Sequence, residues 1–358
     1  MEKLVVNLSF WRGRRVLVTG HTGFKGGWLC LWLSSLGAEV HGYALAPSTN
    51  PALFDLAKIG SLLTTSQIAD IRDNKTLSDT VNRTRPEIIF HLAAQPLVRY
   101  SYSAPIETYA VNIMGTAYLL EAVRQSNCVQ AVVSITTDKC YDNREWLWSY
   151  RENEPLGGHD PYSSSKACAE LVCAAYQKSF FNASGVALAT ARAGNVIGGG
   201  DWSKDRLLPD FFRSIDNHEI LTIRSPNAIR PWQHVLEPLS GYLALAENLV
   251  TFGSQVAEAW NFGPIDEDAR SVNWILERLS TLMPELRWQC EALEKPHEAN
   301  YLKLDSSKAR ARLDWTPRWR LDMALKMTVE WHRAWQLGSD MRAISLAQID
   351  TYLSSTAQ

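Results

Sequence analysis

Residues 15–26 read Arg-Val-Leu-Val-Thr-Gly-His-Thr-Gly-Phe-Lys-Gly, and this stretch decides the fold. The first five residues are largely apolar and β-branched, which is typical of a short strand. Apolar residues at helical spacing follow from Trp28 to Leu36, and Gly37 stands where a glycine that ends a helix is expected. The stretch therefore predicts a strand, a glycine turn and a helix in direct succession.

Three glycines, Gly20, Gly23 and Gly26, lie three residues apart in the predicted turn. Glycine lets the backbone turn tightly and approach a pyrophosphate, while the helix N-terminus supplies partial positive charge. An ordinary turn is the alternative, but a glycine triplet between a strand and a helix favours dinucleotide binding. We expect the cofactor to contact Gly20, Thr22, Gly23, Phe24, Lys25 and Gly26.

A second predicted strand, residues 39–43, completes the first βαβ unit. Ala44 stands at its end, where an acidic residue that binds the adenosine ribose is expected. No arginine follows in residues 45–48 to take a 2′-phosphate, so the sequence favours NAD over NADP. Asp70 and Ile71 are candidates for contact with the adenine, and a solvated loop aspartate is an equal alternative at this position.

Further strands are predicted at 88–92, 131–135 and 186–190, with helices at about 105–126 and 162–181 between them. Alternating strands and helices predict an α/β fold with a Rossmann-type, doubly wound parallel sheet. The alternation ends after the glycines at 198–200. We expect residues 10–197, with 231–263 returning to them, to form the NAD-binding domain. Residues 198–230 and 264–350 would form a smaller C-terminal substrate-binding lobe.

Composition limits the classes of function. The 358 residues carry a net charge of -2, so nothing favours nucleic acid as a partner. The six cysteines form no Cys-x-x-Cys pair and no metal-ligand spacing with histidine, so we expect neither disulfides nor a metal site. No run of 18 apolar residues occurs, which argues against a membrane span. We expect a soluble cytoplasmic protein.

A candidate catalytic pair lies in Tyr162-Ser163-Ser164-Ser165-Lys166, which follows Pro161 at the start of a predicted helix. Residues four apart share a helix face, and a lysine ammonium near a phenol lowers the pKa of that phenol, which makes it a general base. Alone, this spacing is more often structural; behind a dinucleotide loop it favours catalysis. Thr137, Asp138 and Lys139 follow the predicted strand at 131–135, and ligands gather at such strand ends.

With these motifs, the chain resembles the extended short-chain dehydrogenases/reductases over nearly its whole length. The matching landmarks are the glycine triplet, His91-Leu92-Ala93-Ala94-Gln95, Tyr162-x-x-x-Lys166, Arg192-Ala193-Gly194-Asn195 and Arg230-Pro231-Trp232. The resemblance implies NAD contacts at Leu92, Ala93 and Ala94 and also at Tyr162 and Lys166. It also implies a nucleotide-sugar substrate and a homodimer packed through the helices at 105–126 and 162–181. The alternative is that the apolar faces of these helices pack against their own sheet.

Within this family, the dehydratases that act on dTDP-glucose carry an Asp-Glu pair where this chain has Asp138-Lys139. That departure is similar to the branch that dehydrates CDP-glucose, as are residues 21–26 and 198–202. The resemblance implies that Tyr162 takes the C4 hydroxyl proton, Thr137 steadies the oxygen and Asp138 is the acid at C6. Lys139 would be the base at C5 or a charged group that steadies the enolate, and a structural lysine is the weaker alternative.

The remaining substrate contacts are implied by the resemblance alone. They are Gln95, Arg99, Asn195, Leu221, Ile223, Arg230 and His297. Among these, Asn195 and Arg230 would contact the diphosphate, for which arginine offers a bidentate cationic fork. The implied pathway role is to supply a precursor for deoxyhexoses of a bacterial lipopolysaccharide. Alternatives are a dTDP- or GDP-sugar 4,6-dehydratase, a UDP-sugar 4-epimerase and, more distantly, a non-catalytic protein that senses dinucleotides.

Overall fold

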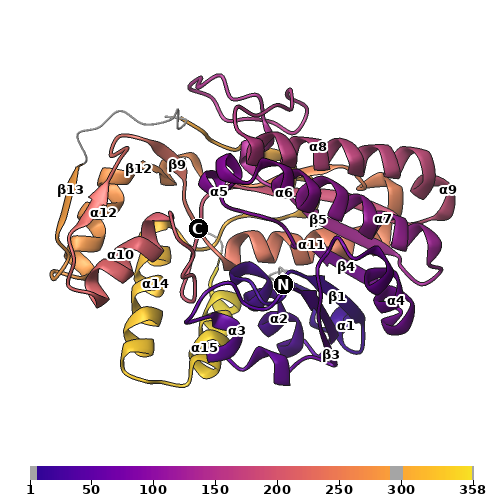
Figure 1. The fold of residues 1–358 in the computed structure, drawn as a ribbon, viewed down its shortest axis with the longest axis horizontal. Helices are drawn as coiled ribbons and strands as arrows, with labels where there is room; N and C mark the ends of the chain where they lie inside the picture. Colours follow the sequence, from indigo (N-terminus) through magenta and orange to yellow (C-terminus); the bar gives the residue numbers. More distant parts are fainter. Residues whose placement is uncertain (1–5, 291–300, 357–358) are drawn as a thin grey trace.

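A parallel sheet forms the centre of the computed structural model, which describes residues 6–290 and 301–356 (Figure 1). Its seven strands run in the order β11-β6-β5-β4-β1-β2-β3, and every neighbouring pair is parallel. The strands are β1 (Arg15–Thr19), β2 (Glu39–Ala44), β3 (Thr65–Ile68), β4 (Ile88–His91), β5 (Ala131–Ile135), β6 (Ala187–Ala193) and β11 (Ala259–Phe262). The order reverses between β1 and β4, which confirms the predicted Rossmann-type sheet and places the ligand crevice at the carboxyl ends of these strands.

Helices cover both faces of the sheet (Figure 1). One face packs against α2 (Phe24–Ser35), α11 (Leu236–Phe252) and α15 (Met341–Ser354), and the other against α4 (Asn74–Thr84), α7 (Gly115–Gln125) and α8 (Pro161–Tyr176). Since both faces are covered, β1 and β5 are almost wholly buried, as their apolar runs predict. Short helices join these layers: α1 (Leu8–Trp11), α3 (Leu53–Leu56), η1 (Ile59–Ser61), α5 (Val98–Ser103), η3 (Asp138–Cys140) and η5 (Gly253–Gln255).

A smaller lobe with its own apolar core lies at one end of the sheet (Figure 1). Its helices are α10 (Leu207–Asp216), α12 (Val272–Leu282) and α14 (Leu321–Gln336). Its strand pairs are β8 (Leu221–Ile223) with β13 (Trp288–Cys290) and β9 (Ile229–Pro231) with β12 (Ala269–Ser271). The pair β7 (Val196–Ile197) and β10 (Gln233–His234) and η6 (Asp266–Asp268) complete the described elements here. The short helix α13 (Ser307–Leu313) packs instead against the core of the main sheet.

Several boundaries differ from the sequence prediction. The helix expected from Trp28 begins at Phe24, because Gly23 is its N-cap. The two long helices contain π-helical turns: α6 (Pro105–Tyr109) leads through η2 (Ala110–Met114) into α7, and α8 leads through η4 (Gln177–Phe181) into α9 (Asn182–Ser184). The polar edge strand β3 was not predicted individually, because its Thr-Ser-Gln sequence lacks an apolar run.

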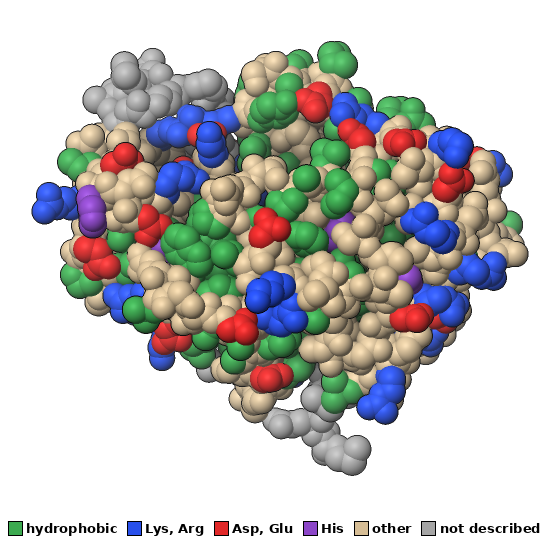
Figure 2. Space-filling model, turned by 60° about the horizontal axis from the view of Figure 1, so that its bottom comes forward, with side chains coloured by type: hydrophobic (Ala, Val, Ile, Leu, Met, Phe, Trp, Pro, Cys, Tyr) green, Lys and Arg blue, Asp and Glu red, His purple; other side chains and the backbone are tan. Residues whose placement is uncertain are grey.

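The surface mixes charges of both signs. Basic and acidic side chains are interspersed over the face in Figure 2. No helix among the described residues is long and apolar enough to cross a membrane. The six cysteines all lie in described segments and are free thiols. Within the same segments, no cluster of three His, Cys, Asp or Glu side chains is arranged to hold a metal ion.

Candidate active site

The glycine loop forms a cradle with no room for side chains. Gly20 has φ +77°, and a Cβ there would lie 2.8 Å from the Ala93 nitrogen. A Cβ on Gly26 would lie 2.1 Å from the Gly20 carbonyl oxygen. Glycine is therefore required at both positions, and the N-terminus of α2 opens directly behind the loop. This cradle fits the pyrophosphate of a dinucleotide, as the spacing predicts.

Other candidate cofactor residues hold the loop in place. Thr22 donates its hydroxyl to the Leu45 carbonyl at 2.8 Å, which ties the loop to the end of β2. The amides of Leu92 and Ala93 both donate to the Thr19 hydroxyl at 3.1 Å, so the segment after β4 is fixed beside β1. Phe24 packs against the core beneath the loop. These contacts bring the segments after β1, β2 and β4 together.

Asp70 is held in a local ion pair. Arg72 binds its carboxylate at 2.6 Å and lowers the pKa of Asp70. The Asp70 carbonyl accepts a hydrogen bond from the Tyr43 hydroxyl at 2.7 Å. Ile71 is buried in the core between the sheet and helices α4 and α7. An adenine contact would therefore share the Asp70 carboxylate with Arg72.

Thr137 and Asp138 follow β5 at the crevice. Thr137 donates to one carboxylate oxygen of Asp138, Oδ1, at 3.0 Å. The second oxygen, Oδ2, is buried and accepts no hydrogen bond from the described residues. Burial raises the pKa of Asp138, and Lys139, Thr137, Arg230 and Lys25 act in the opposite direction. A buried carboxyl with a raised pKa and a free oxygen is suited to hold a proton and donate it.

Tyr162 and Lys166 are both buried on α8, which begins at Pro161 after the N-cap Asp160. Lys166 donates its ammonium to the Ile135 carbonyl at 3.1 Å, and burial lowers its pKa to about 8. Burial raises the pKa of Tyr162 to about 12, against a hydrogen bond with Thr137 and the charge of Arg206. The sequence-based expectation of a lowered phenol pKa is therefore wrong for this chain alone, because burial outweighs the neighbouring cations.

One charged residue of this site, Arg206, was missed. Arg206 forms an ion pair with the buried Asp201 at 2.8 Å, and its charge acts on Tyr162 and Lys25. Lys25 was expected to bind cofactor, but its charge also acts on Asp138, and burial lowers its pKa to about 8. The glycines at 198–200, just before Asp201, were the sequence signal that this loop reaches the site. They could not predict the position of Arg206, because that position depends on the conformation of residues 200–206.

The expected substrate contacts differ in where they lie. Arg230 is buried and its charge acts on Asp138, and Asn195 lies between β6 and β7. Arg99 is exposed and pairs with Asp205 at 3.1 Å. The side-chain amide of Gln95 is engaged with Leu97 in its own loop and with the Thr108 hydroxyl on α6.

Two expected base contacts belong to the core of the smaller lobe. The side chains of Leu221 and Ile223 are buried there, so a contact with the base would come through their backbone. His297 lies outside the described residues.

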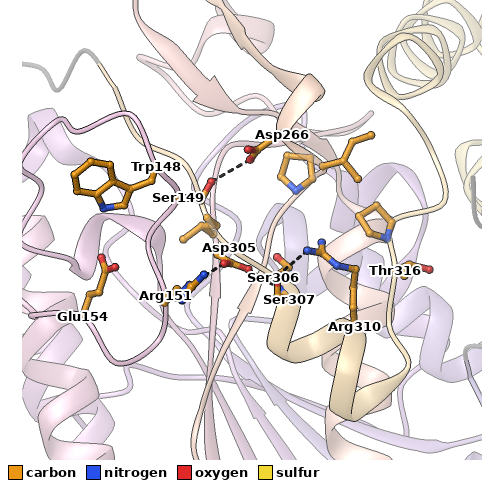
Figure 3. Close-up of a pocket in the computed structure, with 14 residues that line it drawn as sticks. Trp148, Ser149, Arg151, Glu154, Asp266, Asp305, Ser306, Ser307, Arg310 and Thr316 are labelled. Atoms are coloured by element: carbon orange, nitrogen blue, oxygen red, sulfur yellow. Dashed lines mark hydrogen bonds and ion pairs between the residues drawn. The ribbon is translucent and has the colours of Figure 1, made fainter.

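A separate cavity of about 760 Å³ lies away from these residues (Figure 3). It opens between the loop that carries Trp148 and the start of α13, and an Arg151–Asp305 ion pair of 3.0 Å crosses its wall. The predicted site residues do not line it.

The Rossmann sheet, the glycine cradle and the buried Tyr162-x-x-x-Lys166 helix define a short-chain dehydrogenase/reductase. The model of the GDP-mannose 4,6 dehydratase family matches residues 17–328. The chain belongs to this family. It is 55% identical over 360 residues to a CDP-glucose 4,6-dehydratase of Salmonella typhimurium, with 99% of this chain and 100% of the relative covered.

Solved structures share the fold at low sequence identity. A dTDP-glucose 4,6-dehydratase from Bacillus anthracis in complex with NAD has a TM-score of 0.74 and 20% identity, with 92% of this chain and 100% of that chain covered. An epimerase from Methanothermobacter thermautotrophicus has a TM-score of 0.80 and 23% identity, with 94% and 97% covered. At this identity the likeness concerns the fold.

Proposed function

We propose that this chain is an NAD-dependent lyase that converts CDP-glucose to CDP-4-dehydro-6-deoxyglucose and water. The observation that carries the proposal is the buried Asp138 carboxyl, which has a free oxygen and lies beside Thr137 and Tyr162 at the end of β5. Oxidation of a hydroxyl requires a base such as Tyr162, whereas loss of water also requires an acid that protonates the leaving hydroxyl, such as Asp138. The 55% identical CDP-glucose 4,6-dehydratase supports the reaction and the nucleotide.

The first step is oxidation at C4. Tyr162 removes the proton of the C4 hydroxyl, and the Thr137 hydroxyl, which hydrogen-bonds Tyr162, holds the same oxygen. NAD, held in the cradle of Gly20, Gly23 and Gly26, would supply the acceptor for the C4 hydride and the donor for C6, and its positively charged nicotinamide would favour a phenolate. The buried Lys166, one helical turn after Tyr162 on α8, donates a hydrogen bond to the Ile135 carbonyl at the end of β5.

The second step eliminates water across C5 and C6. The C4 carbonyl acidifies the C5 proton, which passes to a water molecule as the C6–O bond breaks, and Asp138 gives its proton to the departing hydroxyl. Hydride then enters at C6 while a proton returns to C5. Oxidation at C4 and reduction at C6 use the same two electrons, so no cofactor is consumed. Burial raises the pKa of Asp138 and so favours the protonated form that this step needs.

Lys139 acts, in this proposal, as a charged group that steadies the enolate. Its charge lowers the pKa of Asp138, which is the effect of an ammonium beside a carboxyl. The alternative, in which a neutral Lys139 is the C5 base, predicts that Lys139→Met stops exchange of the C5 proton with deuterated water. A charged Lys139 predicts slower exchange that still occurs.

Substrate and partner assignments extend the proposal. Arg230 and Asn195 would bind the diphosphate, since Arg230 is buried beside the acid. A homodimer would form through α6, η2, α8 and η4, whose exposed apolar side chains are Ile106, Met114, Leu171 and Phe180. Sedimentation should give twice the chain mass for the wild type and one chain mass for Leu171→Glu. The cytoplasmic location remains a prediction from the composition, and the lipopolysaccharide precursor role remains a prediction of the family resemblance.

An activity panel tests the proposal. Purified protein is assayed with CDP-, dTDP-, UDP- and GDP-glucose and GDP-mannose, with and without added NAD, for a 4-keto-6-deoxy product. We expect product from CDP-glucose and no net reduced cofactor. Failure with every nucleotide-hexose contradicts the dehydratase assignment, and product from another nucleotide alone contradicts the CDP assignment.

One variant separates a dehydratase from an epimerase. Asp138→Asn keeps the shape of the side chain but removes the acid, so reduced nicotinamide should accumulate while water loss slows by about 100-fold or more. Asp142→Asn, four residues away in an exposed ion pair with Arg144, is the control and should retain turnover. An epimerase would be little affected by the change at Asp138.

A further inference from the structure

A buried ion pair lies behind the proposed active site. Glu170 on α8 and Arg192 on β6 pair at 2.8 Å, and each side chain is only 3% exposed. A buried pair is stable only when additional hydrogen bonds satisfy its atoms. Each carboxylate oxygen of Glu170 accepts one hydrogen bond from the Arg192 guanidinium and one from a threonine hydroxyl. Arg192 donates Nε to Oε1 at 2.9 Å and Nη2 to Oε2 at 2.8 Å.

Two threonines complete the set of donors. Thr136 donates its hydroxyl to Oε1 of Glu170 at 2.5 Å, and Thr190 donates to Oε2 at 2.6 Å. Both threonines are buried, at 4% and 5% exposure. Their surroundings differ: Thr190 lies opposite Ser134 inside the sheet, whereas Thr136 directly precedes Thr137.

The contact at Thr136 bears on the direction of the catalytic side chains. The amide of Thr136 continues the ladder by donating to the Ala191 carbonyl at 2.9 Å, and Thr137 has extended backbone with φ -151° and ψ 158°. Side chains of successive extended residues point to opposite sides. Holding the Thr136 hydroxyl on the Glu170 side therefore holds Thr137, and through it Asp138, on the crevice side.

The outer side of the pair is fixed as well. Arg192 donates Nη1 to the Tyr141 hydroxyl at 2.8 Å and to the Glu152 carbonyl at 3.1 Å. Tyr141 in turn donates to Asn261 on β11 at 2.7 Å. Glu170 is thus held on β6 by Thr190 and Arg192, and Arg192 is held in turn by Tyr141 and Glu152, so contacts other than Thr136 fix the position of Glu170.

We infer that Glu170 is a positioning residue for the proposed reaction, which acts through its hydrogen bond with Thr136 to aim Thr137 and Asp138 at the substrate. This inference rests on the proposed function. It assigns to a buried ion pair a role in turnover beyond that of holding α8 against the sheet. Misplacement of reacting groups by a fraction of an ångström lowers kcat more than it changes binding.

A matched pair of variants tests the inference. Thr136→Val and Thr190→Val each remove one hydroxyl from the same carboxylate and should lower the thermal midpoint by similar amounts. We expect Thr136→Val to lower kcat with CDP-glucose by about tenfold or more at nearly unchanged KM, and Thr190→Val to keep kcat within about twofold. Thr136→Ser restores the hydroxyl and should recover kcat. Thr136→Ala and Thr190→Ala replace the valine pair if extra methyl groups prevent folding.

The outcomes separate the two levels of the proposal. Equal kcat values in the Thr136 and Thr190 variants, with active wild-type protein, would overturn the positioning role alone. Wild-type protein that turns over no nucleotide-hexose would overturn the proposed function and this inference with it.

Discussion

Gly194 lies against the free oxygen of Asp138. A Cβ built on Gly194 would come within 3.1 Å of Asp138 Oδ2 and 2.4 Å of the Pro231 ring. The same oxygen accepts no hydrogen bond from the described residues. The acid therefore lies where the end of β5, the turn after β6 and strand β9 meet, and the turn closes on it with no space to spare.

Gly194→Ala should impair turnover through this contact. The added methyl group must displace Pro231 or the acid, so we expect kcat to fall by about tenfold or more. Gly185→Ala is the control: its φ of +80° makes alanine costly for the backbone, yet nothing lies within 4 Å of the new Cβ. Steady-state assays on both variants should show loss of kcat only at position 194. Unchanged kcat in Gly194→Ala would mean that the turn relaxes without moving the acid.

Gly26→Ala should weaken NAD binding. Its Cβ would lie 2.1 Å from the Gly20 carbonyl, so the loop must open and the cradle must change shape. We expect the Kd for NAD, from calorimetry, to rise by about tenfold or more. Gly338→Ala, whose new Cβ would have nothing within 4 Å, is the control and should bind NAD normally. Normal binding by both variants would argue against a pyrophosphate site in this cradle.

Arg206→Gln should shift the pH dependence of C4 oxidation. The Arg206 cation favours the phenolate, so its removal raises the pKa of Tyr162 further above its value of about 12. The phenolate fraction at a given pH then falls, and the rate of cofactor reduction should drop by up to about tenfold for each unit of pKa. Single-turnover absorbance across pH in the Asp138→Asn background isolates this step. Lys204→Gln, an exposed neighbour, is the control, and identical profiles for both variants would exclude the effect.

Glu237 should make stability depend on pH. It is buried beneath α15, accepts the amides of Arg318 and Trp319 and the Tyr352 hydroxyl, and burial raises its pKa from 4.5 to about 7. Between these values the folded chain binds the proton and the unfolded chain does not, so its contribution to the free energy of unfolding decreases as pH rises through this window. The upper limit is about 3 kcal/mol.

Glu237→Gln removes this titration. Urea unfolding at pH 5 and pH 8 should therefore show a smaller decrease in the variant than in the wild type, although the amide disturbs the bonds to the backbone at both pH values. An equal decrease in the two proteins would show that Glu237 titrates near its ordinary pKa in the folded state.

Local patterns in the sequence were enough to predict the sheet and to place the candidate site residues at one edge of it. The strand at 15–19, the glycine triplet and the helix behind it are specified by neighbours in the chain. The meeting of Thr137 and Asp138 with Tyr162 follows from parallel topology, because strand ends share one edge. The edge strand β3 escaped prediction because its polar side chains give no apolar signal.

The electrostatics of the site could not be predicted in the same way. A tyrosine and a lysine four residues apart suggest a lowered phenol pKa, but the lysine donates to Ile135 and burial dominates at Tyr162. The position of Arg206 depends on a loop between two lobes. The Glu170–Arg192 pair joins a helix and a strand 22 residues apart, and no periodic pattern reports such a contact.

The central claim is that hydride leaves C4 of the sugar and returns to C6 of the same molecule. CDP-glucose that carries deuterium at C4 tests it directly, with the product analysed by proton NMR and mass spectrometry. The account predicts that the deuterium is found in the C6 methyl group of a 4-keto product, with no net reduced cofactor. Deuterium retained at C4, or released into free reduced cofactor, would contradict it.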